Sequence, residues 1–271
     1  MSYYKTFIPN MCKLLLLYNT TYNKKKIHSF LMQSLSNKPF VPDVKYPHRH
    51  QHRKLNDDGF GFSYFDDKHQ WITYKYPGVF LSDPNIRPKI QEISTHSLIL
   101  GQLRRKIIGD IRYENTAPFT YQNHVFFHNG IILHYKKHLP KIHNKIHVKY
   151  RKHIQGQTDS EHIFYLLLTF IDEITKNDNI NEAILTQCVS ALLEWFISEH
   201  IYFHINILYA NRTHLIVTRY SHLHKNTNKE LTEPMPLYID NTKGLCISSE
   251  PITENYMLLP ENTILCIPIS I

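Results

Sequence analysis

Two segments with helical periodicity lie in the second half of the chain, and strand-length segments stand on both sides of them. Thr158 and Glu161 have the spacing of a capping box, and apolar residues at helical spacing continue from there to about residue 174. A second apolar stripe predicts a helix over residues 181–197. Because strands and helices follow one another in blocks instead of alternating, the order favours an α+β fold with antiparallel sheets.

Short apolar or alternating stretches bounded by turn residues predict the strands. Before the two helices these strands cover residues 12–18, 56–65, 70–76, 94–104 and 124–127. After the helices we expect two hairpins and a closing strand, at residues 204–209 with 215–220, 237–240 with 245–249, and 263–269.

The composition is that of a globular protein. Hydrophobic residues make up 42% and charged residues 20% of the 271 residues, which excludes a disordered chain. No apolar run has the length of a membrane span or of a secretory signal, so we expect no membrane association. The four cysteines form no CxxC pair, which favours a reduced compartment and a cytoplasmic location.

The first ten residues carry no periodic apolar pattern, and Pro9-Asn10 marks a break before Met11. We interpret residues 1–10 as a leader, a propeptide or an upstream extension. Residues 11–271 are expected to form a single domain.

Two basic segments, at residues 47–54 and 134–153, carry much of the formal charge of +8. Neither segment has the aromatic interleaving of a base-stacking surface or the ligand spacing of a zinc site. Like-charged runs are usually solvated, so we interpret both as exposed loops and do not expect a nucleic-acid partner. Polyanion binding through residues 134–153 stays open as a weaker alternative.

Cys12 directly follows a methionine and precedes an apolar run of strand length. A chain that began at Cys12 would carry a thiol and a free α-amine on one residue. The thiol could attack a carbonyl, and the amine, with a pKa of about 7.7–8.0, could move the proton. With a peptide bond in front of Cys12 the nitrogen is an amide and no base, and a lone buried thiol is most often inert packing.

Five separated pieces share one order with a known family. They are Met11-Cys12, residues 58–61, Arg104, residues 128–130 and residues 156–159. In this order and spacing the chain resembles the class II (N-terminal nucleophile) glutamine amidotransferases, and in particular small stand-alone members of that family. The resemblance covers essentially residues 11–271.

The resemblance implies a four-layer αββα sandwich, in which helices flank two antiparallel sheets. It implies that Cys12 is the nucleophile and its own α-amine the base. The Asn129 side chain and the Gly130 backbone N–H would form the oxyanion hole, Arg104 would hold the substrate α-carboxylate, and Asp159 would hold the α-ammonium. The substrate would be glutamine or a γ-glutamyl compound, cleaved through a thioester, and the family's chemistry needs no metal or organic cofactor. A partner protein subunit is a further expectation.

Two positions depart from the family's pattern. The family usually continues its arginine with a small residue and a threonine, whereas this chain has Arg105 and Ile107. A catalytically degenerate member that serves as a binding or scaffold subunit is therefore the alternative. Taken singly, Arg104 could be a surface charge, Asp159 could complement a helix dipole, and Asn129-Gly130 could be a hairpin turn.

Overall fold

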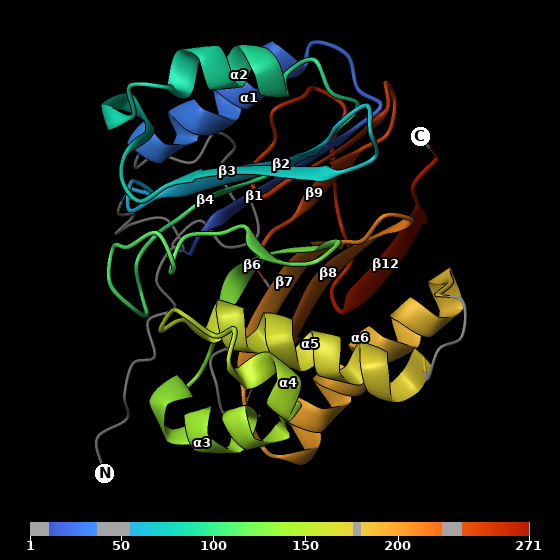
Figure 1. The fold of residues 1–271 in the computed structure, drawn as a ribbon. Helices are drawn as coiled ribbons and strands as arrows, with labels where there is room; N and C mark the ends of the chain where they lie inside the picture. The colour runs from blue at the N-terminus through green and yellow to red at the C-terminus, as the bar shows by residue number, and fades with distance from the viewer. Residues whose placement is uncertain (1–10, 37–54, 176–179, 224–234, 271) are drawn as a thin grey trace.

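Figure 1 shows the computed structural model, in which two sheets lie face to face between two layers of helices. The structure describes residues 11–36, 55–175, 180–223 and 235–270. The expected leader at residues 1–10 and the basic segment at residues 47–54 lie outside the described residues. The four-layer αββα architecture confirms the fold that the sequence predicts.

The seven-stranded sheet has the order β11-β9-β10-β1-β4-β2-β3. Its strands, all paired antiparallel, are β1 (Lys13–Tyr18), β2 (Phe60–Phe65), β3 (Trp71–Tyr76), β4 (Leu98–Leu103), β9 (Tyr238–Asp240), β10 (Leu245–Ser248) and β11 (Met257–Leu258). The predicted strand at residues 94–104 is shorter than expected, because the turn that ends the preceding helix uses Ser94.

The five-stranded sheet has the order β12-β8-β7-β6-β5, and its strands also pair antiparallel. They are β5 (Phe119–Tyr121), β6 (His124–Ile132), β7 (Phe203–Ala210), β8 (His214–His222) and β12 (Thr263–Pro268). The hairpin of β7 with β8 and the pairing of β9 with β10 are both confirmed.

Helices cover the outer face of each sheet (Figure 1). Over the seven-stranded sheet lie α1 (Asn23–Met32) and α2 (Ile86–Ile93), which the sequence reading missed. Over the five-stranded sheet lie α3 (Tyr135–Lys145), α4 (Val148–Arg151), α5 (Asp159–Thr175) and α6 (Glu182–Ser198). The predicted start of α6 is confirmed, because the Asn181 side chain accepts a hydrogen bond from the backbone N–H of Ile184 at 3.0 Å.

Strand β1 is buried on both faces, which explains its continuous apolar run. Leu14 and Leu16 join the larger apolar core, which reaches across both sheets to α5 and α6. Leu15 and Leu17 point the other way and pack in a separate core with α1. The strand therefore lies at the centre of its sheet, between β10 and β4.

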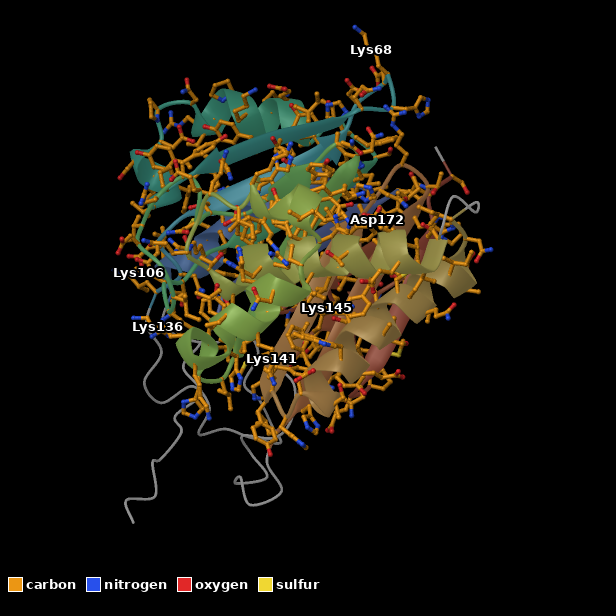
Figure 2. The ribbon with its side chains drawn as sticks, turned by 60° about the horizontal axis from the view of Figure 1, so that its bottom comes forward. Lys68, Lys106, Lys136, Lys141, Lys145 and Asp172 are labelled. Carbon is orange, nitrogen blue, oxygen red and sulfur yellow. The ribbon has the colours of Figure 1, made fainter. Side chains whose placement is uncertain are left out.

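The expected exposed loop at residues 134–153 is wrong: most of this segment is helical. Tyr135 and Ile142 bury one side of α3, while Figure 2 shows lysines along the outside of the same helix. Acids on α5 and at the end of α6 pair with three of the segment's lysines. The ion pairs are Lys141–Glu199 at 2.5 Å, Lys145–Glu173 at 3.0 Å and Lys149–Asp172 at 2.6 Å. These pairs weaken the case for polyanion binding.

Candidate active site

A cleft at the edge of the two sheets brings together four of the five predicted site residues. Cys12 precedes β1, Arg104 follows β4, Gly130 lies in β6, and Asp159 begins α5; all four line the cleft. The four residues come from both sheets and from one helix. No local stretch of sequence could have shown that they meet.

The Cys12 thiol contacts both backbone polar groups of Arg105, its N–H and its carbonyl oxygen. The Arg105 N–H donates to Sγ at 3.4 Å, and the thiol donates to the Arg105 carbonyl at 3.7 Å. Burial raises the pKa of the Cys12 thiol, while the Arg105 N–H and the charge of Arg104 partly oppose this rise. The thiol is therefore protonated at neutral pH, and its use as a nucleophile requires a base.

A buried ion pair fixes the residue after Cys12. Lys13 Nζ lies 3.2 Å from Glu250 Oε1 and donates to the backbone carbonyl of Gln33 at 2.9 Å. Both charged side chains are buried. The start of β1 is thus held from two directions, which fixes the backbone that carries the thiol.

Asn56 contacts the residue in front of Cys12. Its side-chain amide donates to the Met11 carbonyl oxygen at 2.9 Å, and both residues are buried. Because this carbonyl belongs to the peptide bond before Cys12, the Asn56 amide lies beside the nitrogen that would become the α-amine. The sequence reading placed Asn56 at a strand start and assigned it no role in the site.

Arg104 is 5% exposed, and no ion pair joins its guanidinium to a carboxylate in the part of the chain that the structure describes. The guanidinium donates only to backbone carbonyls, those of Asp58 at 3.4 Å, Ile108 at 3.3 Å and Gly109 at 3.5 Å. Burial lowers the pKa of Arg104, yet an arginine stays charged at neutral pH. The cleft thus holds a buried cation without an acidic partner among the described residues.

Asp159 complements Arg104: it is an acid that forms no ion pair with a cation among the described residues. It is 5% exposed, and its two oxygens accept backbone N–H groups, from Ile132 at 3.0 Å and from Ser160 at 2.9 Å. Burial raises the pKa of Asp159 to about 6, against these two N–H donors, which favour the charged form. At neutral pH the cleft therefore presents one carboxylate to a bound cation.

Asn129 and Gly130 do not form a turn. Both lie within β6, paired with Asn206 and Ile205 of β7. Glycine is required at position 130 because a Cβ there would lie 2.1 Å from the carbonyl oxygen of His204. The isolated turn interpretation of this dipeptide is therefore wrong.

Asn129 is not one of the cleft-lining residues in the described chain. Its side-chain Nδ2 instead donates to Ser249 Oγ at 3.4 Å, and Ser249 Oγ accepts from the backbone N–H of Leu14 at 2.9 Å. Asn129 is thus linked to β1 two residues beyond Cys12, and its Oδ1 has no hydrogen-bond partner among the described residues. The predicted oxyanion role of Asn129 stays a prediction.

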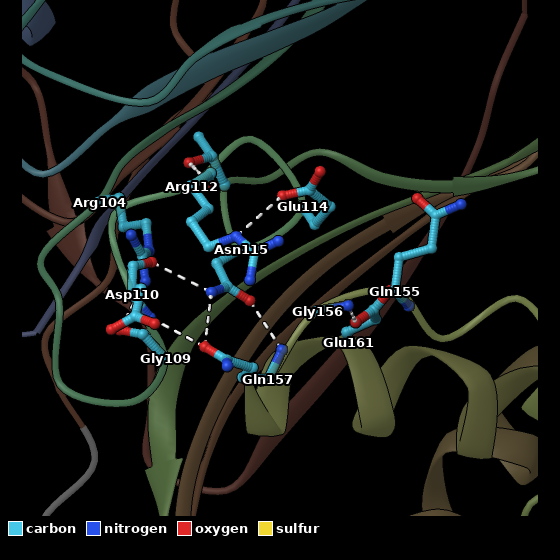
Figure 3. Close-up of polar contacts among 11 residues, drawn as sticks. Arg104, Gly109, Asp110, Arg112, Glu114, Asn115, Gln155, Gly156, Gln157 and Glu161 are labelled. Atoms are coloured by element: carbon cyan, nitrogen blue, oxygen red, sulfur yellow. Dashed lines mark hydrogen bonds and ion pairs between the residues drawn. The ribbon is translucent and has the colours of Figure 1, made fainter.

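The loop before α5 is tied to the loop that follows Arg104 (Figure 3). Asn115 accepts from the Gln157 backbone N–H at 2.7 Å and donates to the Asp110 carbonyl at 3.1 Å. The predicted capping box is half correct, since Thr158 Oγ1 does accept from the Glu161 N–H at 3.3 Å. The Glu161 carboxylate, however, accepts from the backbone N–H groups of residues 155 and 156. These bonds hold Asp159 opposite Arg104.

Two more residues of the cleft were not assigned a role from the sequence. Gln102 donates to the His128 backbone carbonyl at 2.7 Å, and the Arg105 side chain extends into the same cleft. Of the two, the sequence marks Arg105 alone, as a departure from the family pattern. No local signal shows their importance, because it depends on the neighbours that the fold supplies.

Two other kinds of site are absent from the same described ranges. No three histidine, cysteine or acidic side chains there gather closely enough to hold a metal ion. None of the helices found there combines the length and the apolar character needed to cross a bilayer.

Comparisons with known proteins agree on one family. A sequence model described as glutamine amidotransferases class-II matches residues 34–237. The probable glutamine amidotransferase DUG3 of Saccharomyces cerevisiae is 28% identical over 147 residues, which are 52% of this chain and 40% of that protein. The chain therefore matches less than half the length of this curated relative.

Solved structures agree on the fold. A glutamine aminotransferase class-II domain protein from Silicibacter pomeroyi is 18% identical, with a TM-score of 0.58 and 95% of each chain covered. The glutamine phosphoribosylpyrophosphate amidotransferase of Bacillus subtilis is 15% identical, with a TM-score of 0.50 over 88% of this chain and 41% of that one.

Proposed function

The chain belongs to the class II glutamine amidotransferases, and from this premise we propose that it cleaves the γ-amide of glutamine or of a γ-glutamyl compound through a thioester on Cys12. One observation carries the proposal: a guanidinium and a carboxylate, neither of them ion-paired among the described residues, line the same cleft as a thiol. The head group of a γ-glutamyl compound carries both an α-carboxylate and an α-ammonium, and this pair of charges is complementary to Arg104 and Asp159.

The reaction follows from these positions. The Cys12 sulfur attacks the γ-carbonyl carbon, and its proton passes to the α-amine of the same residue. The carbon–nitrogen bond breaks, and the leaving amine takes the proton. Water then hydrolyses the thioester, which releases a free γ-carboxylate and restores the thiol. The oxyanion of each tetrahedral intermediate needs donors, and by family resemblance these are the Asn129 amide and the Gly130 N–H.

This mechanism requires that Cys12 carry a free α-amine. The structure describes Met11 in front of it, so activity depends on removal of the preceding residues or on translation from Met11 with removal of that methionine. A protein whose N-terminal residue is Cys12 should release glutamate from a γ-glutamyl substrate, and C12A should abolish this release. Absence of both turnover and a γ-glutamyl thioester in the Cys12-initiated protein would refute the proposal.

A binding or scaffold subunit is the second candidate. It is supported by Asn129, which does not line the cleft, and by the half-exposed Ile107 at the family's threonine position. A binding subunit would bind a γ-glutamyl ligand in calorimetry without turning it over. A partner protein and a cytoplasmic location remain predictions from the sequence.

A further inference from the structure

Arg105 places a second cation in the cleft, one more than the proposed head group can neutralise. Its side chain lines the cleft beside Cys12, and its Nη1 is buried with no hydrogen-bond partner among the described residues. Burial lowers the pKa of Arg105, although an arginine remains charged at neutral pH. The side chain as a whole is half-buried, but a buried donor normally has a partner, so Nη1 can still donate to a bound anion.

The charged side chains that line the cleft have a net charge of one positive unit. Arg104 and Arg105 are the cations and Asp159 is the acid. His128 also lines the cleft, but burial lowers its pKa to about 4 and keeps it neutral. A zwitterionic head group satisfies Arg104 and Asp159 and adds no net charge, so Arg105 stays uncompensated.

The nearest acid outside the cleft does not supply the missing partner. The electric field of Asp58 acts on Arg105, but the two side chains form no ion pair. One oxygen of Asp58 is instead occupied at 2.7 Å by the backbone N–H of Lys106.

The position of Arg105 indicates which part of a substrate it can reach. Its backbone N–H contacts Cys12 Sγ at 3.4 Å, and the charge of Cys12 acts on its guanidinium, so the side chain starts beside the atom that attacks the carbonyl. The acyl chain between that carbonyl and the head group consists of uncharged methylenes. The part of a γ-glutamyl amide that can still carry an anion is therefore the leaving amine.

We propose that Arg105 is a specificity-determining residue that binds an anionic group on the leaving amine. The preferred substrate class is then a γ-glutamyl amide of an amino acid or other acidic amine, and free glutamine is a poor substrate. This inference rests on the proposed function and narrows its substrate class.

The test compares two substrates of similar size that differ by one carboxylate, γ-glutamylglycine and γ-glutamylethylamide. Glutamate release by the Cys12-initiated protein gives kcat/KM for each. We expect R105Q to lower the ratio of the two values by about 10- to 100-fold, the usual effect of losing one charge-assisted hydrogen bond. R105K, which keeps the charge but loses the planar fork, should restore part of the ratio. K106Q changes the neighbouring exposed cation, which does not line the cleft, and serves as the matched control.

The outcomes separate the two proposals. Failure of the Cys12-initiated protein with Arg105 intact to cleave either substrate or glutamine overturns the proposed function itself, whereas cleavage of glutamine alone overturns the specificity inference. If both substrates are cleaved but R105Q slows them equally, Arg105 acts on the thiol instead, and the specificity inference is wrong. An unchanged ratio in R105Q, or an equal loss in K106Q, also overturns it.

Discussion

The side-chain amide of Asn56 donates a 2.9 Å hydrogen bond to the carbonyl oxygen of Met11, on the peptide bond in front of Cys12. Once that bond is gone, the same amide is in place to orient the new α-amine. We therefore expect Asn56 to position the proposed base.

We predict that N56A in the Cys12-initiated protein lowers kcat by about tenfold, because a misoriented amine transfers the proton less efficiently. The acid limb of the kcat–pH profile should shift at the same time, which simple loss of packing would not cause. Steady-state glutamate release between pH 5 and 10 measures both effects. A tenfold loss with an unshifted profile would show that Asn56 is only structural.

Cys12 should react slowly with iodoacetamide when a peptide bond precedes it. Burial raises the pKa of its thiol, so less thiolate is present at pH 7 than in a free cysteine of pKa about 8.5. The rate should rise with pH and continue to rise above about pH 9.5, where a free cysteine of pKa about 8.5 has nearly levelled off. Mass spectrometry of the peptide that contains Cys12 separates it from Cys188, Cys246 and Cys266. Faster alkylation than N-acetylcysteine at pH 7 would contradict the expected protonated state.

The buried carboxylate of Asp159 should make stability fall as pH rises. Its folded pKa of about 6 lies above the unfolded value of about 3.9, so the folded protein holds this proton more tightly. The free energy of unfolding then decreases between about pH 4 and pH 6, by on the order of 1–3 kcal/mol from this group. Urea unfolding at several pH values should show a steeper decrease in the unaltered protein than in D159N. Parallel curves would mean that the pKa is not raised.

The same carboxylate should control substrate binding. Because the ionised form binds the α-ammonium, kcat/KM should fall as pH drops below about 6. D159N should raise KM by about 10- to 100-fold at pH 7.5, the cost of losing a charge-assisted bond. T120A, an exposed change on β5, provides the matched control. A KM unaffected by D159N would remove Asp159 from the binding site.

Gly130→Ala should destabilise the fold strongly. The added Cβ would lie 2.1 Å from the His204 carbonyl oxygen and 2.4 Å from His128 Nε2, so β6 and β7 must move apart. We expect a loss of about 3 kcal/mol or more in urea unfolding. Gly78→Ala, which meets the Tyr76 ring at 3.1 Å, should cost far less. Equal costs for the two variants would contradict the close approach of the strands.

Breaking the ion pair of Lys13 and Glu250 should also be costly. E250A leaves the Lys13 charge buried without this carboxylate and is expected to lower stability by about 3–5 kcal/mol. The double variant K13M/E250L should recover much of the loss, because it removes both charges. E173A, which removes the exposed partner of Lys145, should cost about 1 kcal/mol or less. A small effect of E250A would show that the pair does not hold the start of β1.

Local apolar patterns were sufficient to predict β1, α5 and α6, because β1 and α5 are buried along most of their length and α6 buries one apolar face. The α3 segment was misread because its neutralising acids are distant in sequence: Glu173 follows Lys145 by 28 residues and Glu199 follows Lys141 by 58. Repulsion between neighbouring lysines is visible in a sequence, whereas these ion pairs require the fold.

The site residues also divide into those that the sequence indicates and those whose contacts only the fold reveals. Family resemblance identified Arg104 and Asp159, and the structure adds what resemblance could not, namely that each lacks an oppositely charged partner among the described residues. Resemblance also named Gly130, as an oxyanion donor, and that role stays a prediction, whereas the close His204 carbonyl explains why the residue is a glycine. Asn56 and Arg105 acquire their roles only from contacts with Met11 and Cys12.

Arg104 extends from one sheet of the sandwich, and Asp159 begins a helix that packs on the other. A ligand held at both charges would act as a clamp across the sandwich. Ligand binding should therefore raise the melting temperature, and the rise should grow with the logarithm of ligand concentration. The same rise is expected in a C12A protein, which binds the ligand but cannot turn it over.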